Sequence, residues 1–501
     1  MRSFIEWEIL QKGIDKMKNM AKKALSIFLC IVLCAGMLPP VAHAAEDETE
    51  ASLAWSEMAS AEAVSGEASV EALTDAAEPE AEPPSAEADA TQGQTQSVTF
   101  INEYGREQTV SAYMLSDGDF SVEAQYIAVS GSVTLNNGLS IYYGKGGSSN
   151  STGSAVYLIL CDGAELTLSA GGIKIYPGDH IISGGTCRMT LNICAQAEGT
   201  GKLNVSTASR YYGVGISTAY GNNLNVYGGD ITLQGGGMGS DGIGITREGE
   251  DDGYALGKVI ISGGTVRTSG GGIRNGISAS AVEVKGGTLI ASGGVKMISA
   301  GSGIAATGSV SVSGGDVTAT GLNGVSCDSL TVRAGDITAN AITDGNYGIK
   351  ANTAMISGGE VAATGLDGIN GKTITISGGT VEAEAVPNGS LASRGIYAGE
   401  KLTLTGGTVR VAGAVQSETI ELGYTSVDGA SYTADSWTGT VSLSKPFRYA
   451  DTGEAAALPL QGGRTIIPMI PSGGSCGENV TWSFDEASGV LFISGTGKMM
   501  T

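Results

Sequence analysis

One short stretch of the sequence, Gly236–Ile243, has residue types and a spacing that suit calcium. It reads Gly-Gly-Met-Gly-Ser-Asp-Gly-Ile and fits the calcium-binding phrase G-G-x-G-x-D-x-U, in which U is a large aliphatic residue. An acidic insertion follows, and carboxylates are the hard oxygen ligands that calcium prefers. The predicted calcium ligands are Asp241, Glu248, Glu250, Asp251 and Asp252. The alternative interpretation is that Asp241 stabilises its own glycine turn beside a solvated acidic loop.

Six tyrosines are the candidate contacts for a sugar. Sugar binding needs a flat ring face against the sugar C–H groups and polar groups nearby for the hydroxyls. We expect these tyrosines in turns and insertions rather than at inward strand positions. They are Tyr211, Tyr212, Tyr220, Tyr254, Tyr347 and Tyr397. The alternative is that they cap turns and keep their hydroxyls in water.

The residues for catalysis are few. The chain has two histidines, His43 and His180, which nearly excludes a His-based triad or a multi-His zinc site. A pectin hydrolase on a β-structure would show paired Asp motifs and a Gly-His-Gly, and neither is present. A polysaccharide lyase would use an Arg or Lys as its base. The candidates Arg247, Arg274 and Arg394 stand at different points of their repeats, so we expect solvated surface roles and predict no enzyme.

A repeated phrase supplies the elements that must position these side chains. It consists of an alternating apolar pair, a small residue, Gly-Gly or Ala-Gly, then Thr, Asp or Glu and an aliphatic residue, and it recurs eight times. Its second glycines are Gly229, Gly264, Gly287, Gly315, Gly335, Gly359, Gly379 and Gly407. They are 20 to 35 residues apart, and a Gly-Ile or Gly-Val phrase stands between them.

Within one repeat the apolar period is two, as on a strand. In Thr373–Ile376 the two Ile point one way and the two Thr the other. A single repeat buries little, so the repeats must stack and pair their backbones with their neighbours. The sequence predicts an all-β fold, a right-handed parallel β-helix, with glycines of positive φ at its corners. A propeller or a sandwich is the rival, but propeller blades recur at about 40 residues.

The rest of the chain divides by composition. Basic residues, an apolar run and Ala42-His43-Ala44 indicate a signal peptide, and the following stretch carries fourteen acidic residues without Lys or Arg. The expected organisation is a signal peptide at 1–44, a disordered acidic linker at 45–97, a β-rich N-terminal part of the solenoid at 98–206, β-helix repeats at 207–411, a β-rich cap at 412–470 and the start of a truncated C-terminal domain at 471–501.

Charge and composition exclude several classes of protein. The formal net charge of −23 opposes nucleic acid and anionic lipid as partners, because those partners need clustered Lys and Arg. The 79 glycines argue against a helical bundle, since Gly costs about 1 kcal/mol against Ala in a helix. Once the signal peptide is removed, five cysteines remain, without CxxC pairs. Cys187 and Cys194 are close enough in sequence to bridge, but free buried thiols are the simpler interpretation.

The iterated phrases Ile-Ser-Gly-Gly-Thr-Val and Asp-Gly-Ile resemble those of clostridial secreted proteins described as carbohydrate-binding. The resemblance implies a β-helix that binds plant polysaccharides such as cellulose or pectin and holds calcium. The phrase Cys476–Gly497 resembles the lead-in to leucine-rich-repeat surface proteins of gut Firmicutes. We therefore expect a secreted or cell-surface, non-catalytic carbohydrate-binding or adhesive protein whose partner is a polysaccharide or a host or cell-surface glycan, with no membrane span after signal cleavage. The alternatives are a polysaccharide lyase and a spacer that displays a C-terminal leucine-rich-repeat domain.

Overall fold

The structure is a computed structural model, and its described residues belong to the compact unit Ala90–Thr501. They are 94–143, 154–177, 189–207, 215–217, 222–236, 240–244, 257–296, 299–342, 346–388, 392–427, 429–469, 473–477, 479–485, 490–496 and 498. The predicted signal peptide and nearly all of the predicted acidic linker lie outside them. So do Cys187, His180 and most of the insertion that follows Ile243.

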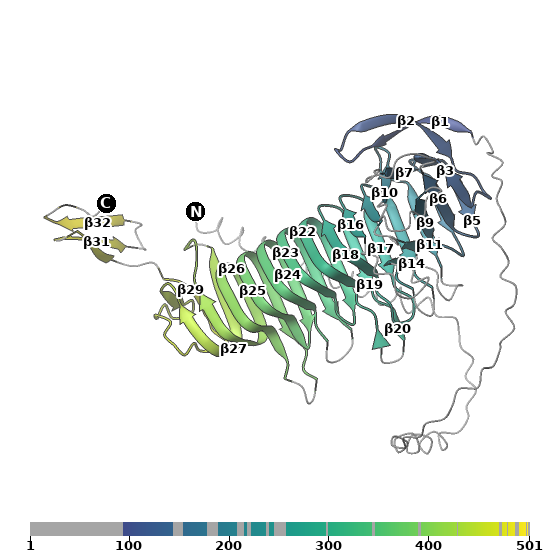
Figure 1. Cartoon of the computed structure of the whole chain (residues 1–501). Coiled ribbons are helices and arrows are strands. Elements are labelled where there is room, and N and C mark those ends of the chain that lie inside the picture. Colours follow the sequence, from purple (N-terminus) through teal and green to yellow (C-terminus); the bar gives the residue numbers. More distant parts are fainter. Residues whose placement is uncertain are drawn as a thin grey trace, which may run out of the picture. The chain divides into compact units, whose positions relative to one another are not determined.

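The described residues form an all-β structure in which no helix occurs, as the sequence predicted (Figure 1). The strands of the first half are β1 (Thr95–Ile101), β2 (Glu107–Met114), β3 (Ser121–Glu123), β4 (Tyr126–Val129), β5 (Ser132–Leu135), β6 (Leu139–Tyr143), β7 (Ser154–Leu160), β8 (Glu165–Leu168), β9 (Ile173–Pro177), β10 (Met189–Ala195), β11 (Lys202–Ser206), β12 (Ile216–Ser217), β13 (Asn223–Val226), β14 (Asp230–Gln234), β15 (Ile243–Gly244), β16 (Lys258–Ile261) and β17 (Thr265–Ser269).

The strands become longer in the second half, where several run through the corners of a repeat. They are β18 (Ile277–Val284), β19 (Thr288–Ser292), β20 (Val295–Lys296), β21 (Ser299–Ala300), β22 (Ile304–Gly321), β23 (Val325–Ala341), β24 (Ile349–Gly365), β25 (Asp367–Ala385), β26 (Arg394–Leu422), β27 (Ala430–Leu443), β28 (Phe447–Tyr449), β29 (Thr465–Pro468), β30 (Gly473–Gly477), β31 (Val480–Asp485) and β32 (Val490–Gly495). No helix able to cross a membrane is found in the part of the chain that the structure describes.

Most strands belong to one large mixed sheet, whose pairing follows the sequence repeat. Ile374 of β25 pairs in parallel with Ala354 of β24 on one side and with Leu402 of β26 on the other. The same in-register parallel pairing links β4, β7 and β10 near the beginning of the sheet and reaches β27 at its end. Parallel pairing thus extends beyond 207–411 in both directions, and each strand lies beside its equivalent in the neighbouring repeat.

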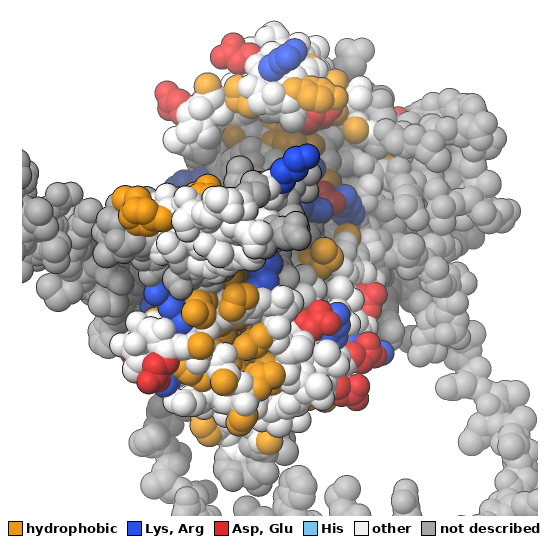
Figure 2. Space-filling model, turned by 90° about the vertical axis from the view of Figure 1, so that its left-hand side faces the viewer, with side chains coloured by type: hydrophobic (Ala, Val, Ile, Leu, Met, Phe, Trp, Pro, Cys, Tyr) orange, Lys and Arg blue, Asp and Glu red, His pale blue; other side chains and the backbone are white. Residues whose placement is uncertain are grey.

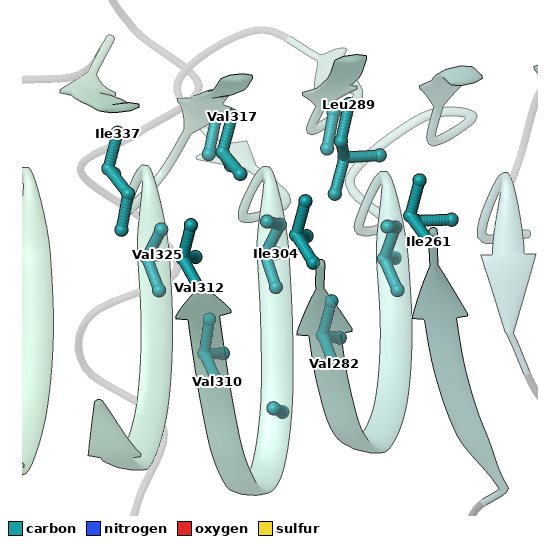
Figure 3. Close-up of a cluster of buried hydrophobic side chains, with 14 of the residues drawn as sticks. Ile261, Val282, Leu289, Ile304, Val310, Val312, Val317, Val325 and Ile337 are labelled. Atoms are coloured by element: carbon teal, nitrogen blue, oxygen red, sulfur yellow. The ribbon is translucent and has the colours of Figure 1, made fainter. Parts of the chain in front are cut away.

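One hydrophobic core lies beneath these strands, and its members are the residues expected to point inward. Figure 3 shows Ile304, Val310 and Val317, which come from three segments of β22, turned toward a shared interior. All three are at most 3% exposed. The predicted inward row after the glycines is buried throughout and comprises Val266, Leu289, Val317, Ile337, Val361, Val381 and Val409. The period-two prediction of the inward residues is therefore confirmed.

The glycine corner, meaning the second glycine of each repeated pair, has the backbone that the sequence predicted. All eight of these glycines have positive φ, from 73° at Gly264 to 92° at Gly229. A Cβ on Gly379 would lie 2.6 Å from the carbonyl oxygen of Gly359, its equivalent one repeat earlier. Stacked glycine corners therefore exclude a side chain for two reasons, the sign of φ and the closeness of the next repeat.

A hairpin packs on the outer face of the first repeats. Strands β1 and β2 pair antiparallel, and Phe100 is 1% exposed in a second hydrophobic cluster. That cluster joins Val98, Phe100 and Ala112 of the hairpin to Ala128, Ile159 and Cys194, which follow one another in register on β4, β7 and β10. The hairpin therefore covers apolar side chains that would otherwise face water.

The last repeat is covered less completely. Strand β29 pairs antiparallel with β27 at Tyr432 and Thr433. Further along β27, Trp437, Val441 and Leu443 pack on the core but stay half-buried. Figure 2 views the molecule from the side on which β27 and β29 lie in Figure 1, and hydrophobic side chains gather in its lower part among basic and acidic ones.

Candidate functional site

In several repeats an Asp or Asn side chain precedes the Gly-Ile or Gly-Val phrase, at a position here called the polar corner, which Ser302 and Tyr347 occupy in repeats between them. The Asp and Asn residues at this position are Asp241, Asn275, Asn323 and Asp367. The Oδ1 atom of Asp241 accepts a hydrogen bond from the backbone N–H of Asn275 at 2.8 Å, and the Oδ1 of Asn275 accepts one from Ser302 at 2.8 Å. Each donor is the equivalent residue of the next repeat. These side chains therefore bridge neighbouring repeats, in addition to local contacts such as the hydrogen bond from Asn275 Nδ2 to Ser278 Oγ at 2.9 Å.

Asp241 is the one predicted calcium ligand among the described residues. It is 8% exposed, and burial raises the pKa of its carboxyl while the hydrogen bond from Asn275 opposes that shift. The remaining predicted ligands, Glu248, Glu250, Asp251 and Asp252, lie outside the part of the chain that is described. Within that part, no three His, Cys, Asp or Glu side chains gather as a metal site. Calcium binding stays a prediction. Asp241 already has a structural role, because its carboxylate accepts the hydrogen bond from Asn275.

Asp367 and Arg394 form a buried ion pair at the polar corner. Asp367 is fully buried, and Arg394 donates from Nε to Oδ1 at 2.8 Å and from Nη2 to Oδ2 at 3.1 Å. The backbone N–H of Arg394 also donates to Oδ1 at 3.2 Å. The prediction of a solvated Arg394 is therefore wrong, because its guanidinium neutralises a carboxylate that lies one repeat earlier. Arg274 is exposed, and Arg247 lies outside the described residues.

The ion pair fixes the position of Tyr397. The guanidinium carbon of Arg394 lies 4.1 Å from the centroid of the Tyr397 ring, which is a cation–π contact. On the other side of the ion pair, Asn370 donates from Nδ2 to Oδ2 of Asp367 at 2.6 Å. An amide that donates to this carboxylate keeps its own oxygen as a free acceptor. Asp367 thus orients one amide directly and one aromatic ring through Arg394.

Two of the predicted sugar-binding tyrosines, Tyr347 and Tyr397, are among the described residues, and they lie at different positions of the repeat. Tyr347 is at the polar corner position, where its backbone N–H donates to Oδ1 of Asn323 at 3.2 Å. Tyr397 follows the Gly-Ile phrase two repeats later and pairs with Asn370. Both side chains are half-buried. The other four candidates, Tyr211, Tyr212, Tyr220 and Tyr254, lie outside the described residues.

Tyr397 lines a groove of about 440 Å³ that crosses β22, β23, β24, β25 and β26. The register gives the groove two walls and a floor. The first wall consists of Ser326, Lys350, Asn370 and Tyr397. The second wall consists of Thr307, Asp328, Asn352 and Lys372. The floor consists of Ala306, Cys327, Ala351 and Gly371. Small floor residues leave room between two rows of polar and aromatic side chains.

The chemistry of the groove is hydrogen bonding, charge and ring contact. The Nδ2 atom of Asn352 donates to Asp328 in the second wall, and Lys350 places its ammonium 5.7 Å from the centroid of the Tyr347 ring. Burial raises the pKa of the Cys327 thiol to about 12, so the floor of the groove holds no thiolate at neutral pH.

The sequence patterns indicated Tyr397 but none of the other groove residues. Lys350 and Asn370 each follow directly the aliphatic residue of a Gly-Ile phrase, as Tyr397 does. The signal that could have found them is therefore the position one residue after that phrase, compared between repeats.

Comparison with known proteins identifies no relative, since no family model, no curated protein and no solved structure matches this chain.

Proposed function

We propose that the chain is a right-handed parallel β-helix that acts as a non-catalytic, secreted or cell-surface carbohydrate-binding or adhesive protein. The parallel in-register pairing at repeat intervals and the single aliphatic core support the β-helix. Secretion rests on the sequence of residues 1–44. The observation that carries the binding function is the groove, in which the ring of Tyr397 is held beside amide, hydroxyl and ammonium groups.

Those groups match the chemistry that recognises sugars. A tyrosine ring packs against sugar C–H groups, and planar amides meet pairs of hydroxyls. Because Arg394 is fixed by the buried Asp367, the Tyr397 ring loses little further freedom when a ligand binds. Preorganisation of this kind lowers the entropic cost of association. The ligand class that fits best is a polysaccharide or a surface glycan.

A glycan array probed with the full chain tests the proposal, and we expect binding without release of unsaturated sugars. Tyr397→Ala should weaken binding by about tenfold, as expected from the loss of one aromatic contact. Tyr104→Ala is the matched control, since Tyr104 is 76% exposed on the turn between β1 and β2.

Each alternative gives a different result on the array. Release of unsaturated sugars would indicate a polysaccharide lyase. A wild-type chain that binds no glycan would favour the spacer that displays a C-terminal domain. Equal losses of glycan affinity in Tyr397→Ala and Tyr104→Ala would show that the groove is not the binding site.

A further inference from the structure

We propose that the groove holds an extended, linear glycan that runs along the direction in which the repeats follow one another, so that consecutive sugar units meet consecutive repeats. This inference rests on the proposed glycan binding and adds to it the form and direction of the ligand. It depends on how the register arranges the two walls.

The first wall is built from the same position in four successive repeats. Ser326 pairs with Lys350, Lys350 with Asn370, and Asn370 with Tyr397. On the other side, the register places Asp328 beside Asn352, and a hydrogen bond joins the two side chains. The walls therefore run parallel to the direction of stacking and across the strands.

The dimensions suit a chain ligand. Neighbouring strands are about 4.8 Å apart, so the four steps from β22 to β26 cover about 19 Å. One unit of an extended pyranose chain is about as long as one such step. At β23, β24 and β25 both walls offer a sugar a polar group, whereas β22 offers only Thr307 of the second wall and β26 only Tyr397 of the first.

The two ends of the groove differ, so a bound chain has a preferred direction. At the β26 end the first wall offers the ring of Tyr397, held by Arg394 at 4.1 Å. At the β22 and β23 end the walls offer the hydroxyls of Thr307 and Ser326. Between these ends lie Lys350 in the first wall and Lys372 in the second, which also holds the single carboxylate of the lining, Asp328, so the walls accept neutral and acidic sugars alike.

The experiment is calorimetric titration of the full chain with two length series, β-1,4-linked glucose oligosaccharides and α-1,4-linked galacturonate oligosaccharides, each from the monosaccharide upward. In the series that binds, affinity should rise with each added unit and then level off at about the four units that four strand steps accommodate. Equal affinity for the monosaccharide and the longer oligosaccharides would overturn the proposal, because it would indicate a pocket for a single sugar.

A blocking variant tests the same point at the other end of the groove from Tyr397. Ser326→Trp should place an indole ring in the groove beside the first wall. It should weaken binding of the longest oligosaccharide by about tenfold. Thr331→Trp is the matched control, since Thr331 is also half-buried on β23 but does not line the groove. Asn352→Ala shortens a side chain of the second wall and adds no bulk. It should also lower the affinity for the longest oligosaccharide. Thermal melts of the three variants establish that they are folded.

The outcomes separate this inference from the proposed function. If binding is lost in Tyr397→Ala but unchanged in Ser326→Trp and Asn352→Ala, the protein binds glycans and the axial chain is wrong. If neither series binds and the array is also blank, the proposed function fails as well.

Discussion

The glycine corner and the polar corner solve the same problem in different ways. Both turn the chain from one strand segment to the next, and both are stacked from repeat to repeat. At the glycine corner the backbone does this alone, through positive φ at residues such as Gly379. At the polar corner a side chain such as Asp367 accepts hydrogen bonds from the next repeat. The comparison teaches that a corner closed by side chains can also position a binding site, because side chains reach the surface.

The largest expected effect follows from Asp367→Ala. This change leaves the Arg394 guanidinium partly buried without its carboxylate and leaves the Arg394 backbone N–H without its acceptor. Breaking a buried ion pair from one side costs about 3–5 kcal/mol of unfolding free energy. Denaturant unfolding measures the loss.

The matched control for this change is Asp230→Ala. Asp230 pairs with Arg267, and both side chains are 47% exposed. An exposed pair of this kind contributes at most about 1 kcal/mol. A similar small loss in both variants would show that the polar corner depends on its backbone as much as the glycine corner does.

A smaller effect is expected at the glycine corner itself. Gly379→Ala adds a Cβ at φ +79° and 2.6 Å from the oxygen of Gly359. Gly453 has φ +75° with no heavy atom within 4 Å of an added Cβ, so Gly453→Ala isolates the backbone strain of about 1–2 kcal/mol. Gly379→Ala should lose clearly more stability in the same unfolding assay. Equal losses would mean that the neighbouring repeat moves aside at little cost.

The smallest effect is expected from Asp241→Asn, which makes this repeat like those with Asn275 and Asn323. Burial raises the folded-state pKa of Asp241, so the wild type loses stability as pH rises from about 4 through that pKa. Asparagine keeps the acceptor and does not titrate. With a chelator present, the variant should therefore match the wild type at low pH and be slightly more stable at pH 7, as measured by denaturant unfolding.

Calcium provides the complementary measurement for Asp241. If the predicted calcium site exists, adding calcium should raise the melting temperature of the wild type, and Asp241→Asn should remove that rise. An unchanged wild-type melt with calcium and with chelator would end the calcium hypothesis.

The inward residues and the glycine corners could be predicted because each requirement acts within one residue or between close neighbours. Ile374 and Ile376 show their inward direction by alternation alone, and Gly379 shows its corner by lacking a Cβ. The groove could not be predicted in this way. Lys350, Asn370 and Tyr397 differ in type and are separated by 20 and 27 residues, so only the pairing register brings them together.

The same register explains why the sequence predicted a solvated Arg394 instead of an ion pair with Asp367. Its partner Asp367 lies 27 residues away in the sequence and becomes a neighbour only when the repeats pair. Alternation along one strand reports which side chains face inward, but it does not report which residues of the neighbouring repeat a side chain meets.

The hairpin of β1 and β2 has a consequence for the order of folding. Most strands pair across short separations, such as Ala354 with Ile374, so contact order is set by the repeat and not by the chain length. The bond from Gln196 Nε2 to the carbonyl oxygen of Thr99 is different, because it joins residues 97 positions apart at 2.8 Å. During synthesis β2 can pair with β4 as soon as Tyr126–Val129 has been made, but the contacts of the hairpin with Cys194 and Gln196 must wait for β10 and the residue after it. The stack can therefore grow in the direction of translation while the hairpin completes its contacts late.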